Sequence, residues 1–174
     1  MGDEVWYATI VGVIVLSGLS IFYILYLAKM RRTKTNAAWK QAATELGLDF
    51  TPVTRIFGKY RMSGVIGKQL SCSVWAYTKP NGQGGYTTFM NYDVRFSQPL
   101  NKVKELLTPN IQSKLLEVNN VLKKVVVSDD SINSTRVSGF IRKSEILIQN
   151  VKLLIQLAEL IIPNEEVDSI FEEI

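Results

Sequence analysis

The sequence predicts an α+β protein in which a single N-terminal transmembrane helix precedes an antiparallel sheet of about five strands with packed helices. Three patterns predict this class. Residues 5–28 carry no charge, residues 60–96 alternate between apolar and polar side chains, and residues 145–162 are apolar at helical spacing. About 145 of the 174 residues follow the apolar segment, which is enough for one domain with a buried core.

Residues 5–28 predict a helix that crosses a membrane. Thirteen of them are Ile, Leu, Val or Phe, which favours insertion by on the order of 5 kcal/mol. As a helix they reach roughly 36 Å, against a hydrocarbon core of about 30 Å. A cleavable signal peptide would begin with positive charge and have a shorter apolar stretch, whereas this chain begins with Asp3 and Glu4. We therefore expect a permanent span.

The flanks of the span predict its orientation. No basic residue precedes it and four follow within six positions, and positive charge is retained on the cytoplasmic side. We expect residues 1–4 to lie outside the cytoplasm and the remainder inside, at the cell membrane. The four basic side chains are expected to contact the membrane surface, the alternative being that they act only as the topology signal. They are Lys29, Arg31, Arg32 and Lys34.

Behind the span we expect a basic juxtamembrane linker at 29–36, a cytoplasmic α+β domain at 37–162 and an acidic amphipathic tail at 163–174. Within the span, Ala8 and Gly12 form a small-xxx-small pair that is a candidate for pairing with a second helix.

The domain is expected to begin with a helix capped by Thr35 or Asn36. Its apolar residues recur at the spacing of one helical face, and they include Trp39, which we interpret as a core anchor. Gly47 is typical of a helix stop, with Leu48 folding back on the last turn as in a Schellman ending.

Strands are expected at 60–66, 69–78 and 86–96, joined as a meander. In the second strand Cys72 lies on one face and is expected to be a small buried hydrophobe. The opposite face is either exposed to solvent or covered by a helix. The glycine-rich segment 79–85 joins two strands and fits neither phosphate-binding motif, so it predicts a hairpin loop. The residues of the opposite face are Ser71, Ser73, Trp75 and Tyr77.

Thr108 and Pro109 predict the start of a further helix. Residues 121–128 and 132–140 then predict a second hairpin around a polar turn at Asp129 and Asp130.

Ser144 is expected to cap a long helix at 145–162, in which one narrow polar stripe is surrounded by apolar residues. Such a helix is either packed deeply on the sheet or paired with a partner on its second side. The stripe consists of Gln149, Lys152, Gln156 and Glu159.

The tail repeats the amphipathic pattern on an acidic background. A helix this short is marginal in water, so we expect it to dock on its own domain or in another protein's groove. The candidate docking residues are Val167, Ile170, Phe171 and Ile174.

The sequence contains no recognisable catalytic, metal-binding or nucleotide-binding motif. The chain has no histidine and one cysteine, so the commonest general base and metal ligand are missing and an intramolecular disulfide is excluded. We expect no catalytic residue, no cofactor site and no metal site. Basic residues such as Lys59, Arg61, Lys68 and Lys79 are scattered through predicted strands, so we expect no nucleic-acid binding.

The opening of the domain carries a resemblance. It reads Trp39-x-x-Ala42-x-x-x-Leu46-Gly47-Leu48-x-Phe50, with Gly58, Gly64 and Gly67 following before a strand. This opening, with residues 139–158, resembles a group of uncharacterised bacterial and archaeal single-pass membrane-anchored α+β domain proteins. The resemblance implies the fold and supplies no catalytic residues.

These patterns favour a non-catalytic, membrane-anchored accessory or scaffold protein that presents a cytoplasmic interaction domain as a subunit of a larger membrane complex. Its expected partners are membrane lipids and either another protein or a second copy of the chain. The alternative is a membrane-anchored lipid- or small-ligand-binding module that uses the basic region 29–80 and a cavity between sheet and helices.

Overall fold

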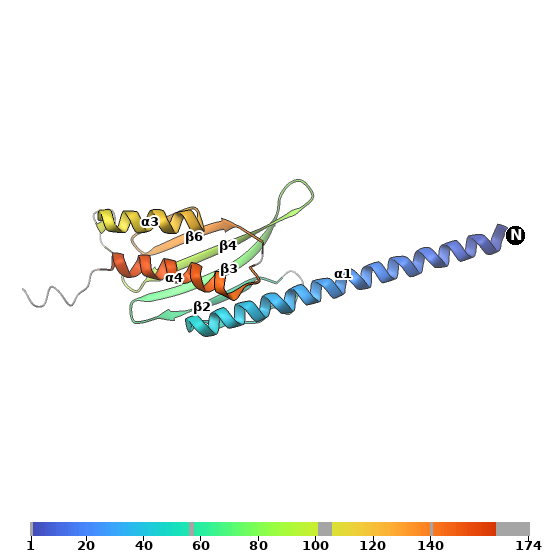
Figure 1. Ribbon diagram of the computed structural model, residues 1–174, viewed down its shortest axis with the longest axis horizontal. Helices are drawn as coiled ribbons and strands as arrows, with labels where there is room; N and C mark the ends of the chain where they lie inside the picture. Colours follow the sequence, from blue (N-terminus) through green and yellow to red (C-terminus); the bar gives the residue numbers. More distant parts are fainter. Residues whose placement is uncertain (1, 56–57, 101–105, 140, 163–174) are drawn as a thin grey trace, which may run out of the picture.

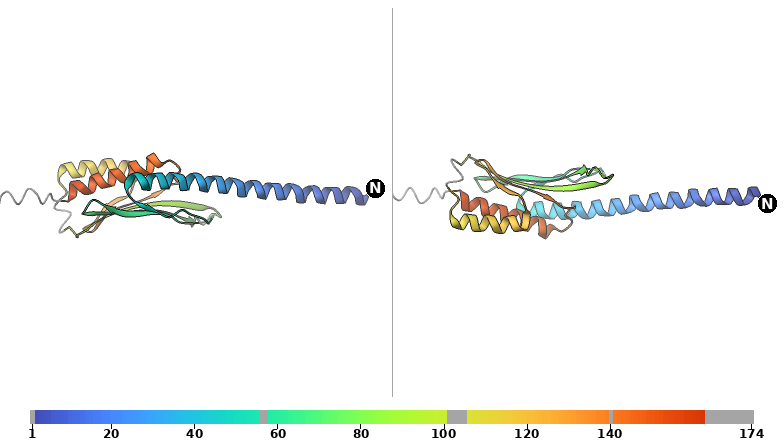
Figure 2. Two further views of the ribbon diagram at one scale, coloured as in Figure 1. Left: turned by 90° about the horizontal axis from the view of Figure 1, so that it is seen from below. Right: turned by 90° about the horizontal axis from the view of Figure 1, so that it is seen from above.

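The computed structural model of the chain is a two-layer α+β fold with a long helix that projects beyond it (Figure 1). The structure describes residues 2–55, 58–100, 106–139 and 141–162. In those residues a six-stranded antiparallel sheet is covered on one face by three helices, and Figure 2 shows the other face without a helix over it. The α+β class is confirmed.

Helix α1 (Gly2–Leu46) runs without a break from the apolar segment into the domain. The predicted cap at Thr35 or Asn36 is therefore wrong, and residues 29–36, predicted as a basic juxtamembrane linker, are helical. The Thr35 hydroxyl instead donates to the Arg31 carbonyl at 2.9 Å, within the helix. The Asn36 amide is used by tertiary structure, because it donates to the Val53 carbonyl at 3.0 Å and accepts from the Val53 N–H at 3.1 Å.

The C-terminal end of α1 has the predicted Schellman geometry. Gly47 has a φ of 68°, and the Leu48 N–H reaches back to the Ala43 carbonyl at 2.8 Å. Gly47 donates to the Thr44 carbonyl at 3.4 Å. Since both bonds use carbonyls of the last turn, the helix ends at Leu46 and the chain turns back toward the sheet.

The sheet has the strand order β1-β2-β3-β4-β6-β5, and every neighbouring pair is antiparallel. The predicted meander of three strands is confirmed. The sixth strand is β1, which pairs with Met62 and Ser63 and is too short to produce a periodic sequence pattern. The strands are β1 (Asp49–Phe50), β2 (Tyr60–Ile66), β3 (Leu70–Pro80), β4 (Tyr86–Phe96), β5 (Val125–Val127) and β6 (Ser131–Val137).

The β3–β4 hairpin projects beyond the sheet on the side of the N-terminal half of α1 (Figure 1). Its tip is ordered by Asn81, whose side-chain carbonyl accepts from the backbone N–H groups of Gln83 and Gly85 at 3.1 and 2.9 Å. The glycine-rich segment is thus the hairpin loop that the sequence predicts.

Helix α3 (Pro109–Leu122) begins at the predicted cap, where the Thr108 hydroxyl accepts from the Ile111 N–H. It continues past the predicted strand start at 121, because Leu122 is fully buried on the same helical face as Ile111 and Val118. The second hairpin then follows, with β5 and β6 on either side of the predicted polar turn.

Helix α4 (Ser144–Ile161) begins one residue earlier than predicted, and Ser144 is its first residue and not its cap. It contacts the sheet through β4 and lies between α1 and α3 in the helical layer (Figure 2). Three neighbours therefore cover its broad apolar surface, while its predicted polar stripe is exposed. This helix is packed within the domain and leaves no wide apolar face for a partner.

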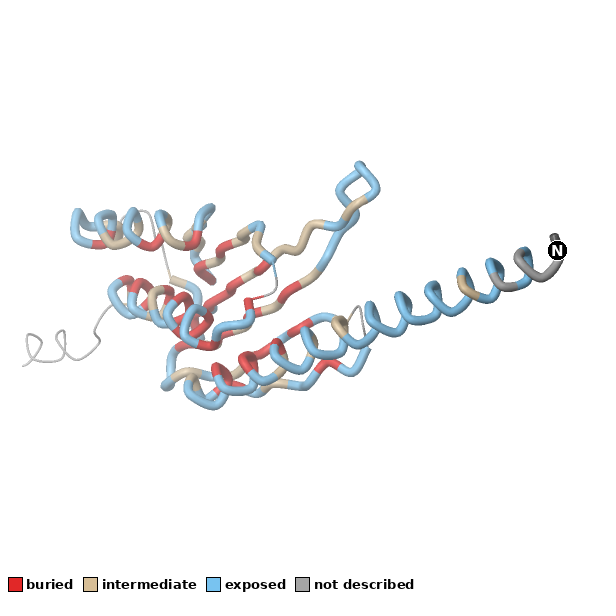
Figure 3. Tube along the Cα trace, turned by 45° about the vertical axis from the view of Figure 1, so that its right-hand side comes forward, coloured by how far each residue is buried: buried red, intermediate tan, exposed pale blue. Residues whose placement is uncertain are grey.

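The core lies between the two layers, where Figure 3 shows the buried positions of sheet and helices facing one another. Trp39 is fully buried, as predicted, with its ring 5.5 Å from that of Tyr60 and 6.1 Å from that of Phe50. Cys72 is also buried as predicted. Since Trp39 belongs to α1, the helix that carries the apolar segment is itself part of the core.

Candidate functional site

The N-terminal half of α1 is the most exposed apolar surface of the described chain. By length and composition, α1 is the one helix among the described residues that is long and apolar enough to cross a membrane. Its most apolar stretch has no buried residue, and Leu16 and Phe22 are 66% and 69% exposed. An exposed surface of this size is typical of a membrane or protein contact.

The predicted helix-pairing residues lie in this half. Nothing lies within 4 Å of the position that a Cβ would take at Gly12, so a second helix would find room there. The side chain of Ala8 is outside the described part, and helix pairing stays a prediction.

A hollow of about 350 Å³ lies where α1 meets the domain, and we call it the basic hollow. Three of the four predicted membrane-surface residues line it, while Lys34 is exposed and does not. The sequence did not predict that Tyr60, at the start of β2, and Arg142, just before α4, would also line this hollow. The lining residues are Leu25, Ala28, Lys29, Arg31, Arg32, Thr35, Tyr60 and Arg142.

One basic residue of the hollow, Arg32, is held by a specific contact. The Arg32 guanidinium donates to the Thr54 carbonyl, which fixes it against the loop before β2. Burial raises the pKa of Tyr60, and a hydrogen bond with Thr35 and the charges of Arg32 and Arg142 partly oppose this rise. Both guanidinium groups are therefore close enough to act on the same phenol.

The second candidate surface is the open face of the sheet, the face without a helix over it. The strand register places Arg61, Trp75, Asn91 and Thr135 in one row across this face. The Thr135 hydroxyl donates to the Asn91 side-chain carbonyl at 2.6 Å, so a hydrogen bond links the side chains of the row on β4 and β6. The face that the sequence left undecided is thus exposed to solvent.

A shallow hollow of about 510 Å³ lies on the open face around Trp75. Asp93 is mostly buried there and forms an ion pair with Arg95 at 2.8 Å. Next to the hollow, the rings of Tyr77 and Phe89 stack at 5.3 Å. The hollow is lined by Lys59, Arg61, Ser71, Ser73, Trp75, Asp93 and Arg95.

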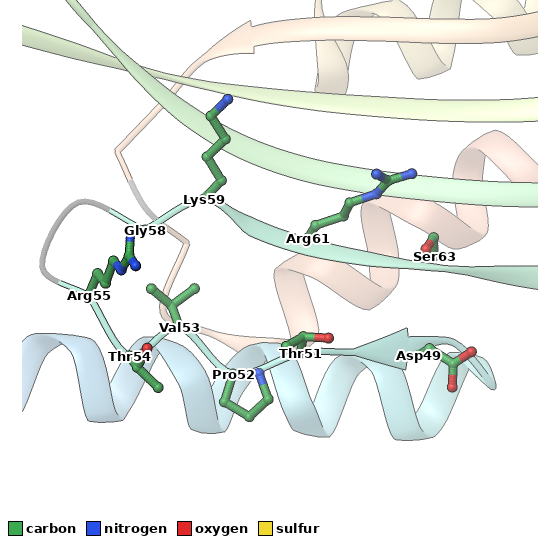
Figure 4. Close-up of a pocket in the computed structure, with 10 residues that line it drawn as sticks. All are labelled: Asp49, Thr51, Pro52, Val53, Thr54, Arg55, Gly58, Lys59, Arg61 and Ser63. Carbon is green, nitrogen blue, oxygen red and sulfur yellow. The ribbon is translucent and has the colours of Figure 1, made fainter.

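The open face continues around the edge of the sheet. A hollow of about 370 Å³ lies at this edge. In Figure 4, Lys59 and Arg61 extend from the side of β2 and Arg55 from the loop that follows β1, while Asp49 lies at the far end. Positive charge therefore extends from the open face to the side of the domain.

Binding is the chemistry that these side chains support. The hydroxyl, amide and guanidinium groups of the open face donate and accept hydrogen bonds, and Asp93, the carboxylate of the hollow around Trp75, is already paired with Arg95. Burial, followed by the charge of Asp93, raises the pKa of the Cys72 thiol to about 12, which makes it a poor nucleophile. Among the described residues no group of three His, Cys, Asp or Glu side chains could hold a metal ion.

The predicted docking residues Val167, Ile170, Phe171 and Ile174 lie outside the described residues, so tail docking stays a prediction. Comparison with known proteins adds no relative, since no family model, no curated protein and no solved structure matches the chain.

Proposed function

We propose that this protein is a non-catalytic, single-pass membrane accessory protein whose α+β domain presents the open face of its sheet to a protein partner. The observation that carries the proposal is the continuity of α1. The helix that exposes an apolar surface long enough for a bilayer also supplies the buried residues Trp39, Ala42 and Ala43 to the domain core. An anchor built in this way holds the domain in one orientation, which a flexible tether would not do.

The orientation of the domain follows from its alignment with α1. The strands run roughly parallel to the axis of this helix (Figure 1). When the helix crosses the membrane, the plane of the sheet is therefore roughly perpendicular to the plane of the membrane. Its open face then looks sideways, toward neighbours in the same membrane. The positive residues after the span support an N-terminus outside and a domain in the cytoplasm.

The composition of the open face supports a protein partner. Trp, Tyr and Arg are the residues that most often dominate the binding energy of protein interfaces, and Trp75, Tyr77 and Arg61 lie on this face. The basic side chains of the hollow and of the adjoining edge outnumber the acidic ones. We infer an acidic partner surface beside the membrane.

The proposal is tested by gentle detergent extraction of the tagged full-length protein, followed by mass spectrometry of stoichiometric partners. Arg61→Glu reverses one charge of the open face, and Lys40→Glu makes the same change on the exposed side of α1. We expect one partner to be retained by the wild-type protein and by Lys40→Glu, and to fall at least tenfold with Arg61→Glu. A wild-type protein that purifies alone, or equal retention by the two variants, contradicts the proposal.

The cytoplasmic orientation has its own test. Gln83 is exposed at the hairpin tip, and Cys72 is buried, so Gln83→Cys adds a single accessible thiol to the described domain. In intact cells a membrane-impermeant maleimide is expected to label this variant only after permeabilisation. Labelling without permeabilisation contradicts an N-terminus outside.

A further inference from the structure

We propose that the basic hollow binds the phosphate of an anionic phospholipid headgroup. This site is separate from the open face and goes beyond the function proposed above. Its ligand is defined by chemistry: a phosphate group carrying negative charge, attached to an apolar body.

The first argument is the convergence of positive charge. Lys29, Arg31 and Arg32 come from α1, and Arg142 is brought to them by the fold from the residues before α4. None of the described residues that line the hollow is acidic. Gathering four like charges costs free energy unless an anion offsets it, so their convergence indicates a bound anion.

The second argument is the depth of the hollow relative to the bilayer. A 24-residue span covers roughly 36 Å, slightly more than the hydrocarbon core, so residues 29–32 lie at the level of the lipid phosphates. The wall on the side of the span is formed by the apolar residues Leu25 and Ala28. An amphiphile fits such a site, because its phosphate meets the basic side chains while its glycerol and upper acyl chain meet the apolar wall.

The third argument is preorganisation. Arg32 is held in place by the Thr54 carbonyl, and Tyr60, the first residue of β2, forms part of the lining on the side of the domain. Guanidinium groups bind phosphate oxygens through paired hydrogen bonds, and fixing them before binding lowers the entropic cost. A flexible basic segment would lack this property.

The test uses Arg142, because substituting a basic residue of α1 would also alter the topology signal. Arg142→Gln removes one charge from the hollow, and Lys143→Gln removes the same charge from the next residue, which is exposed and does not line it. The delipidated full chain in a non-ionic detergent is titrated with phosphatidylglycerol or with phosphatidylcholine of identical acyl chains, and bound lipid is measured by native mass spectrometry. Thermal unfolding of each variant verifies that the fold is retained.

We expect phosphatidylglycerol to bind more tightly than phosphatidylcholine, and Arg142→Gln to weaken it about fivefold while Lys143→Gln leaves it unchanged. Inorganic phosphate, added as a competitor, is expected to displace the lipid only at large excess. Equal loss in the two variants or equal binding of the two lipids overturns the proposal. Displacement by phosphate at concentrations similar to the lipid also overturns it, because the ligand would then be a soluble phosphate.

Discussion

The alignment of the domain with α1, the proposed membrane anchor, leads to a quantitative prediction about depth in the membrane. Gln83 lies at the tip of the β3–β4 hairpin and Gln69 at the opposite end of β3, and both are exposed. Strand β3 has 11 residues, and at a rise of about 3.3 Å per residue its two ends are roughly 33 Å apart. Because the hairpin projects on the side of the anchor, a probe at residue 83 should lie at the headgroups and a probe at residue 69 far from them.

The matched variants Gln83→Cys and Gln69→Cys measure this difference. Cys72 is only 2% exposed and the pKa of its thiol is raised to about 12, so a maleimide fluorophore should react with the introduced cysteine. With the full chain in liposomes, nitroxide lipids labelled at the headgroup should quench the fluorophore strongly at 83 and hardly at all at 69. Equal quenching at the two positions, or stronger quenching at 69, would refute the reasoning.

A third variant connects the depth to the continuity of α1. Thr33 is exposed, and its hydroxyl donates to the Lys29 carbonyl at 3.0 Å between the span and the core. Thr33→Pro removes a backbone donor and makes the proline ring collide with that carbonyl, at a cost of about 3 kcal/mol in helix stability. The helix should kink or break there, and the contrast between probes at 83 and 69 should shrink. An unchanged contrast would show that the helix does not set the orientation of the domain.

Three further predictions concern stability, each measured as the free energy of unfolding of the full chain in detergent. Tyr92→Phe and Asn150→Leu should each lower the free energy of unfolding by about 1–3 kcal/mol, because each leaves one partner of a buried 2.9 Å hydrogen bond unpaired. The double variant should lose less than the sum of the two single losses. Strictly additive losses would mean that the hydrogen bond does not couple the two residues. Gly47→Ala should cost about 1 kcal/mol, since φ is 68° but no atom lies within 4 Å of the new Cβ; a neutral result would contradict the strain. The raised pKa of Cys72 means that the thiol holds its proton more tightly in the folded state than in the unfolded state. Its contribution to the free energy of unfolding is therefore complete below pH 9 and is lost as the pH rises toward about 12. Cys72→Ala should make this loss of stability at high pH smaller, and an unaltered pH profile would refute the prediction.

The parts of the fold that the sequence predicts well are those with local causes. Gly47 ends α1 and Thr108 starts α3 because a helix end is decided by the few residues around it. The meander also follows from local alternation and turn residues. The failures arise where a local signal competes with tertiary structure, as at Asn36, which resembles a cap but bonds to Val53, 17 residues away.

The candidate site shows the same division. Lys29, Arg31 and Arg32 stand out in the sequence because they follow an apolar segment. Arg142 could not be found in this way, since nothing in the sequence around it indicates that it will meet residues about 110 positions earlier. The open face was predicted only as one of two alternatives, because a half-polar strand face is compatible with either solvent or a helix above it.

A partner for the open face need not bind tightly to bind specifically. Anchoring both proteins in one membrane confines them to a thin layer and raises their effective concentration, so a weak contact can be fully occupied. Rigid continuity of α1 adds an orientational gain, because a face held sideways loses less rotational freedom on binding than one on a flexible tether. Moderate contacts from Trp75, Tyr77 and Arg61 would then suffice, and a lipid held in the basic hollow would fix the same orientation from the membrane side. Weaker lipid binding in the basic hollow should therefore reduce partner retention even though the open face is unchanged. Unchanged partner retention by Arg142→Gln would show that lipid binding in the basic hollow does not affect partner binding at the open face.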